Sequence, residues 1–159
     1  MPQLVEAMSR LGTESAFEVL ARANKLAQDG MDVINLGIGQ PDFKTPEHIV
    51  EAAIKALKDG HHGYTPANGI PELREAVAAD IAKYRKCEVN PDNVVIMPGG
   101  KPTMFFAITM FGAPGTEIIY PNPGFPIYES VIKFTGAKPV PMALHEENGF
   151  SFSADEVLG

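Results

Sequence analysis

The feature that most constrains the fold is an uninterrupted apolar run, Val94-Val-Ile-Met97, which is followed at once by Pro98-Gly-Gly-Lys101. Four apolar residues without alternation are typical of a strand that is buried on both faces, as in parallel sheets. Segments with helical spacing stand on both sides of this run, and further short strands are expected after them. This alternation of strands and helices predicts an α/β layer around a largely parallel sheet.

Helices are predicted wherever apolar residues recur at three- and four-residue steps between glycine and proline breakers. Thr45 is expected to cap the second helix, with Pro46 at its first position and Gly60 beyond its end. Ile49 and Leu57 mark the face of this helix that should be buried. The expected helices begin at Ser15, Pro46, Pro71, Lys101 and Pro126, and the expected strands cover 33–36, 94–97, 117–120 and, as an edge strand with two prolines, 138–142.

A capping box, Ser153-Ala-Asp-Glu156, predicts that a further helix starts near residue 153. Only Val157, Leu158 and Gly159 follow it. We interpret this pattern as the sign of a chain cut from a longer protein, and a frayed terminal turn is the alternative.

Composition excludes several classes of function. At 159 residues, with 45% apolar and 21% charged residues, the chain suits one globular domain. Its net charge of -7, without a basic run, argues against nucleic-acid binding. No apolar stretch approaches the roughly 18 residues of a membrane span, and no signal peptide is evident. A single cysteine, Cys87, fits a reducing compartment, so we expect a cytoplasmic protein without membrane partners.

The glycines of Met97-Pro-Gly-Gly-Lys101 stand where a strand is expected to end and a helix to begin. Backbone amides at such a point can approach an anion closely, so the segment could bind phosphate, and a plain tight turn is the alternative. It is not a P-loop, because Val95 and Pro102 replace the required glycine and Ser/Thr. The adjacent pair His61 and His62 lacks metal-ligand spacing, so no metal site is expected.

Three motifs taken together resemble the class I and II aminotransferases, the fold-type I enzymes that use pyridoxal 5'-phosphate (PLP). They are Asn35-Leu-Gly-Ile-Gly-Gln-Pro-Asp-Phe43, Tyr64-Thr-Pro-Ala-Asn-Gly-Ile-Pro-Glu-Leu-Arg74 and Met97-Pro-Gly-Gly-Lys101, in this order. The resemblance, which is closest to the aspartate aminotransferases, implies that residues 1–45 form an N-terminal helix and a substrate-side loop segment. Residues 46–159 would then be the N-terminal portion of an incomplete large PLP-binding domain with a mostly parallel sheet flanked by helices.

The same resemblance implies roles for individual residues. The backbone of Gly99, Gly100 and Lys101 would contact the PLP phosphate. Phe125 would stack on the pyridine ring of the cofactor. Tyr64 would reach across a dimer interface to the PLP phosphate of the neighbouring subunit, so the full-length form would be a homodimer.

On the substrate side, the resemblance implies that the Gly39 backbone lies near the substrate carboxylate and that Ile38 touches substrate. The chain departs from the family at Pro102, which removes one amide donor from the start of the helix. Asp42 is interpreted as a turn or cap residue.

The resemblance also implies that the lysine that binds PLP covalently lies beyond residue 159. No catalytic residue is therefore expected within this chain, and the chain alone is expected to be inactive. The parent protein would be a transferase of amino acid metabolism that moves an amino group from an amino acid to a 2-oxo acid. Two alternatives remain: another fold-type I PLP enzyme, a lyase or synthase, or a non-catalytic module that binds a phosphate-bearing ligand or a partner chain.

Overall fold

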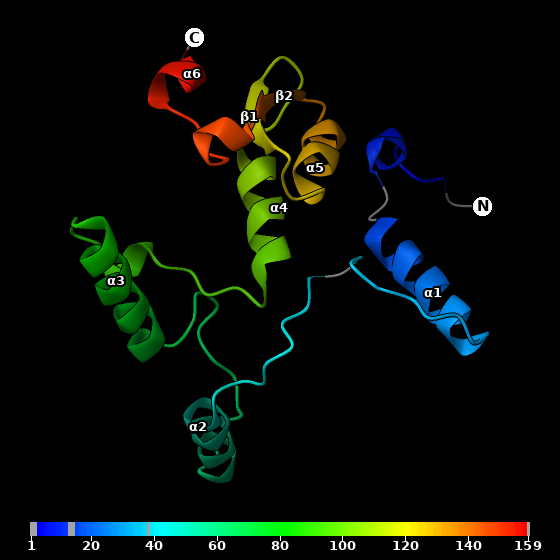
Figure 1. Cartoon of the computed structure of the whole chain (residues 1–159). Helices are drawn as coiled ribbons and strands as arrows, with labels where there is room; N and C mark the ends of the chain where they lie inside the picture. Colours follow the sequence, from blue (N-terminus) through cyan, green and yellow to red (C-terminus); the bar gives the residue numbers. More distant parts are fainter. Residues whose placement is uncertain (1–2, 13–14, 38, 159) are drawn as a thin grey trace. The chain divides into compact units, whose positions relative to one another are not determined.

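The computed structural model of the chain describes residues 3–12, 15–37 and 39–158. The chain divides into two compact units. We call Met1–Ile38 together with Gly99–Gly159 the sheet unit, and Gly39–Pro98 the helical unit. The helical unit carries α2 and α3, whereas the sheet unit carries both strands and the other labelled helices (Figure 1).

A parallel βαβ unit lies in the sheet unit. Strands β1 (Glu117–Asn122) and β2 (Lys138–Ala143) pair in parallel with their first residues opposite each other. Parallel strands need a crossover, which α5 (Ile127–Thr135) supplies. Gly136 ends α5 with φ at +84°, in the left-handed region that favours glycine. The predicted α/β class with a parallel sheet is confirmed, as are the strands expected near 117–120 and 138–142.

The core of the sheet unit forms where α4 (Gly100–Phe111) packs against α5 and α5 packs on the two strands. Val131, Ile132 and Ala137 are buried there, and Ile132 has no exposed surface. Full burial of an isoleucine or valine side chain contributes about 1.5–3 kcal/mol. This packing holds the N-terminal end of α4 and the loop after β1 in one body.

The N-terminal part of the sheet unit contains η1 (Glu6–Arg10) and α1 (Ser15–Gln28). The Arg10 guanidinium donates hydrogen bonds of 2.9 and 3.1 Å to the carbonyl oxygens of Lys133 and Phe134, the last turn of α5. These bonds add to the one from the Gly136 amide to the Lys133 oxygen, in a turn where a helix end leaves carbonyls without intrahelical partners. The predicted helix from Ser15 is confirmed.

At the other end of this unit, η3 (Glu146–Asn148) precedes α6 (Ala154–Leu158). The predicted capping box is confirmed: the Ser153 amide donates to Glu156 Oε2 at 2.6 Å, and the Glu156 amide donates to Ser153 Oγ at 3.3 Å. Among the described residues, no helix has the length and apolar character needed to cross a membrane.

The helical unit contains α2 (Glu47–Lys58), α3 (Pro71–Arg85) and the short η2 (Pro91–Asn93). Pro71 opens α3, as predicted, at a position where its missing amide hydrogen has no cost. Gly60, also as predicted, follows α2 with φ at +90°.

Two predicted strands are wrong. Residues 33–36 and 94–97 are not strands, since the sheet of the described residues consists of β1 and β2 alone. In the second segment Val94 is 8% exposed whereas Val95 is 60% exposed, so only one side of it is covered. The apolar run indicates a strand for the middle of a sheet, but a strand forms only where neighbouring strands supply hydrogen-bond partners.

The predicted start and packing of the second helix are also wrong in detail. Pro46 has an extended ψ of 137° and occupies the N-cap position, so Thr45 does not cap the helix. The helix begins at Glu47, whose charge suits the positive end of the helix dipole. Ile49 and Leu57 are exposed. An amphipathic pattern shows which face of a helix is apolar, but it does not show which other element packs on that face.

Candidate cofactor and substrate site

A glycine turn stands at the start of α4. Gly99 has φ at +92°, a conformation that residues with a Cβ adopt only with strain, and the helix begins at Gly100. A Cβ added at Gly99 would meet no atom of the described residues within 4 Å, so the backbone is open on that side. The conformation of the turn, not crowding, is what requires glycine here.

The first turn of α4 has the properties of an anion site. The first amides of a helix have no carbonyl partner within that helix, and the helix dipole places partial positive charge there. The first turn carries no acidic residue, and glycine at the N-cap position has no side chain that could occupy these amides. Pro102 has no amide hydrogen, so donors in this turn come from Gly100, Lys101 and Thr103.

The loop between β1 and α5 brings Phe125 to this turn. The Lys101 ammonium lies over the Phe125 ring, 5.9 Å from the ring centroid. The half-buried ring also meets Tyr128 edge-on, with centroids 6.1 Å apart and planes at 78°. A Cβ at Gly124 would collide with the Pro121 carbonyl oxygen, so the tight path of this loop requires glycine. The sheet unit thus brings together four of the seven predicted site residues: Gly99, Gly100, Lys101 and Phe125.

The other predicted site residues belong to the helical unit or lie outside the described residues. Tyr64 lies in the loop between α2 and α3, where its side chain is fully exposed at one wall of a hollow. Gly39 is exposed, with open space where a Cβ would stand. Ile38, predicted to touch substrate, lies outside the described residues.

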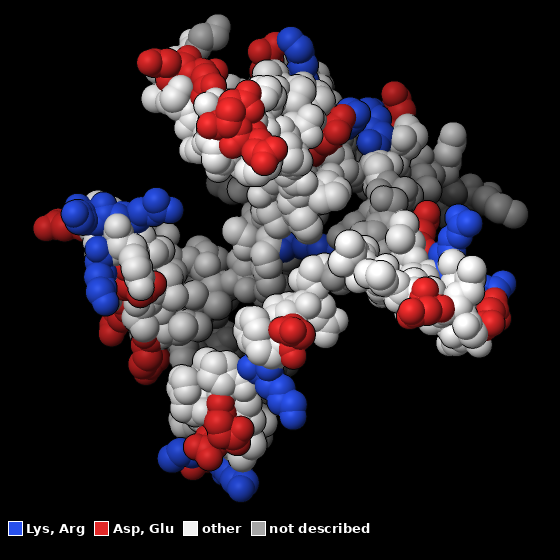
Figure 2. Space-filling model, in the orientation of Figure 1, with Lys and Arg blue, Asp and Glu red and all other residues white. Residues whose placement is uncertain are grey.

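Charged groups near the strands form ion pairs. Lys133 Nζ lies 2.5 Å from Glu129 Oε1 on α5, and this hydrogen bond is the main reason that the pKa of Glu129 is lowered. Burial, followed by the negative charge of Glu129, raises the pKa of Tyr120 on β1. Both shifts keep the groups in their ordinary charge states near neutral pH. On the face shown in Figure 2, acidic and basic side chains both occur around α2 and α3, whereas α4 carries no acidic residue.

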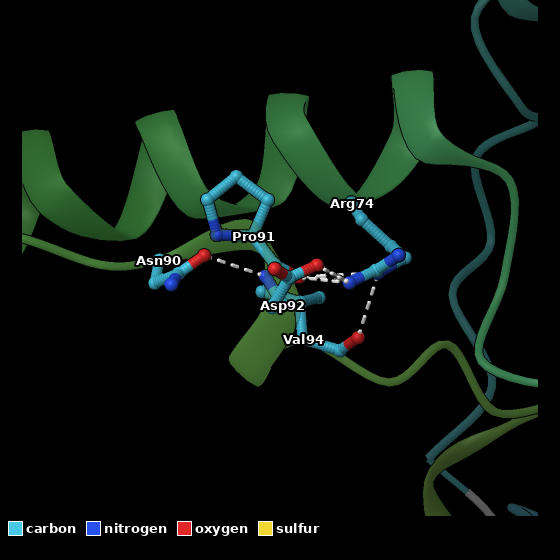
Figure 3. A network of polar contacts seen from close by, with 5 residues as sticks. All are labelled: Arg74, Asn90, Pro91, Asp92 and Val94. Carbon is cyan, nitrogen blue, oxygen red and sulfur yellow. Dashed lines mark hydrogen bonds and ion pairs between the residues drawn. The ribbon is translucent and has the colours of Figure 1, made fainter.

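Arg74 is the last residue of the motif that begins at Tyr64, and its side chain is largely buried. It contacts the backbone at the start of the segment that leads to Met97 (Figure 3). The signal that could have found it is its spacing: Arg74 stands four residues before Ala78, the buried residue of α3.

The sequence profile of the family described as Aminotransferase class I and II matches residues 31–159. A probable aspartate/prephenate aminotransferase of Aquifex aeolicus is 38% identical over 154 residues, which are 97% of this chain and 39% of the relative. An aspartate aminotransferase of Pyrococcus horikoshii is 43% identical over 141 residues, 89% of this chain and 35% of the relative. The solved aspartate aminotransferase of Thermus thermophilus with maleate superposes with a TM-score of 0.88 at 34% identity, over 99% of this chain and 41% of that one.

Proposed function

The chain belongs to the class I and II aminotransferases, and on that premise we propose that it is the N-terminal portion of a PLP-dependent aminotransferase. It spans about two fifths of the length of the curated relatives it matches. The reaction we propose for the parent protein transfers an amino group from an amino acid to a 2-oxo acid. The names of the relatives, which include two aspartate aminotransferases, support an aspartate-like donor.

One observation carries the proposal beyond family membership: the glycine turn of α4 and the ring of Phe125 converge within one unit. We place the PLP phosphate at the Gly99–Gly100 turn, where backbone amides and the helix dipole favour an anion. The Lys101 backbone belongs to the same cradle. Phe125, held by a tight glycine-containing loop, offers a flat face for stacking on the pyridine ring.

The remaining assignments follow from the family. Tyr64, whose phenol is exposed, donates a hydrogen bond to the PLP phosphate of a neighbouring subunit, so the parent protein is a homodimer. Gly39 and Ile38 line the substrate end of the site, where a glycine leaves room for the substrate carboxylate. The division into residues 1–45 and 46–159 stays a prediction, as does a cytoplasmic location.

PLP supplies a carbonyl group that takes up the amino group and a ring that accepts electrons from the bond being broken. The residues of this chain bind and orient the cofactor, and none of them is assigned to proton transfer. We therefore propose that the 159-residue chain alone does not transfer amino groups and that the catalytic lysine belongs to the rest of the parent protein.

The test compares the full-length gene product with the 159-residue chain, each incubated with PLP, L-aspartate and 2-oxoglutarate. Glutamate formation by the full-length protein alone is the expected result. If the full-length protein binds PLP and forms no glutamate from any amino acid, but eliminates or condenses its substrate, it is a lyase or synthase. If it does not bind PLP at all, the proposal is wrong.

A further inference from the structure

A largely buried arginine ties α3 to the segment that follows it. The side chain of Arg74 is 12% exposed. Its Nε lies 3.1 Å from the carbonyl oxygens of both Pro91 and Val94, and its Nη2 lies 2.8 Å from the Pro91 oxygen (Figure 3). Nη2 also meets Asp92 Oδ1 at 2.8 Å, but that carboxylate is 84% exposed. The guanidinium therefore binds mainly backbone, because an exposed ion pair contributes little.

The backbone segment to which Arg74 donates hydrogen bonds is also fixed by a side-chain cap. The Asn90 side chain accepts a hydrogen bond of 2.9 Å from the Asp92 amide, which caps η2. This cap fixes the direction of the Pro91 carbonyl. A guanidinium presents its donors in a rigid planar fork, so it can bind two fixed carbonyls at once in a way that a lysine cannot.

The same segment is joined to the loop that carries Tyr64. The Ile96 amide donates to the Asn68 carbonyl oxygen at 3.1 Å. Gly69, with φ at +101°, approaches so closely that a Cβ there would stand 2.5 Å from Ile96 Cγ1. Its amide closes a turn by donating to the Pro66 carbonyl oxygen at 2.9 Å. The loop from Pro66 to Gly69 is therefore fixed on a segment that Arg74 fixes in turn.

These contacts hold the turn from Pro66 to Gly69, and Tyr64, two residues before that turn, is fully exposed. A rigid loop that presents an exposed phenol loses little conformational freedom when the phenol binds a ligand. We propose that Arg74 is a positioning residue for Tyr64: it holds residues 91–94 so that Ile96 and Gly69 fix the loop from which Tyr64 reaches the cofactor phosphate. The inference rests on the proposed function, which assigns the phosphate to Tyr64.

The experiment is a double-mutant cycle in the full-length protein, with PLP affinity as the readout. Tyr64→Phe removes the phenol donor, and Arg74→Met removes the hydrogen bonds of the guanidinium. Arg74→Lys keeps the positive charge but cannot bind two carbonyls at once. We expect each single variant to raise the Kd for PLP by about 10-fold. The Kd of the double variant, Tyr64→Phe with Arg74→Met, should lie within about 2-fold of the Kd of Tyr64→Phe alone, because the effects of residues that act through one contact are not additive. Arg85→Met, an exposed arginine at the end of α3, is the matched control and should leave the Kd unchanged.

The outcomes separate the inference from the proposed function. If Arg74→Met weakens PLP binding as much in the Tyr64→Phe background as in the wild type, Arg74 does not act through Tyr64 and the inference is wrong. If Tyr64→Phe leaves the Kd unchanged, the assignment of Tyr64 in the proposed function fails, and the inference with it.

Hydrogen exchange gives a second readout that does not depend on the cofactor. In Arg74→Lys, which keeps the charge and most of the side-chain volume, the amides of Ile96 and Gly69 should exchange faster than in the wild type. The amides in the middle of α3 should be unchanged. Equal protection of Ile96 and Gly69 in both proteins would contradict the inference.

Discussion

At the scale of single residues, two glycines of the sheet unit share a positive φ but stand at different places in the chain. Gly99, at the start of α4, and Gly115, just before β1, have φ at +92° and +89°, and neither has an atom of the described residues within 4 Å of an added Cβ. An alanine at either position therefore meets backbone strain and no steric clash with a described residue. Only Gly99 belongs to the proposed phosphate cradle.

This pair gives a prediction in which stability and binding separate. Gly99→Ala and Gly115→Ala should each lower the free energy of unfolding of the full-length protein by about 1–3 kcal/mol, the cost of a sparsely populated backbone conformation for a residue with a Cβ. Only Gly99→Ala should also raise the Kd for PLP. Urea denaturation and PLP titration measure the two effects, and equal PLP affinity in both variants would exclude the turn as the phosphate site.

Phe125 allows a prediction about the ring alone. Phe125→Leu keeps an apolar side chain of similar size but removes the aromatic face, and it should weaken PLP binding by about 0.5–1.5 kcal/mol, the typical contribution of an aromatic pair beyond its buried area. Phe125→Trp retains a flat face and should bind PLP nearly as well as the wild type. Titration of the cofactor by absorbance compares the three proteins, and a tighter complex with leucine than with tryptophan would contradict stacking.

At the scale of elements, local signals predicted the helices and failed for two strands. Pro71 opens α3 and the Ser153–Glu156 capping box opens α6 because these features act within one turn. The strand predicted at 94–97 failed because its partners would have to come from distant sequence, which no local pattern specifies. The convergence of Lys101 and Phe125 was likewise expected only from the family resemblance, since 24 residues separate them in the chain.

The capping box of α6 predicts a pH dependence. Hydrogen bonds from the Ser153 backbone amide and hydroxyl lower the pKa of Glu156. Because this pKa is lower in the folded helix than in the unfolded chain, the stabilisation is present above the ordinary carboxyl pKa and is lost as the pH falls through the lowered value. NMR titration of the Glu156 side chain should show the low pKa, and Ser153→Ala should bring it back toward the ordinary value. An equal pKa in both proteins would contradict this account of the cap.

At the scale of the whole chain, large apolar side chains remain exposed. Met110 and Phe111, at the end of α4, are each 74% exposed, and Ile54 and Leu57 of α2 are also exposed. In each unit, exposed apolar side chains that gather on one helix mark a surface that another part of a protein can cover. We interpret these side chains as surface that the rest of the parent protein covers, in agreement with a chain that spans two fifths of its relatives.

This interpretation predicts the behaviour of the isolated chain. The 159-residue protein should bind an apolar dye such as ANS strongly and self-associate with rising concentration, whereas the full-length protein should do neither. Sedimentation and dye fluorescence measure both properties. A 159-residue chain that stays monomeric and binds no dye would show that its apolar surface is not a packing face.

We propose that this chain supplies the cradle of a PLP enzyme and that the lysine of that enzyme lies elsewhere. The most direct measurement incubates the full-length gene product with PLP, reduces it with borohydride, and maps the modified lysine by peptide mass. We expect one cofactor on a single lysine outside residues 1–159. A cofactor attached to Lys101, or to another lysine of this chain, would contradict it.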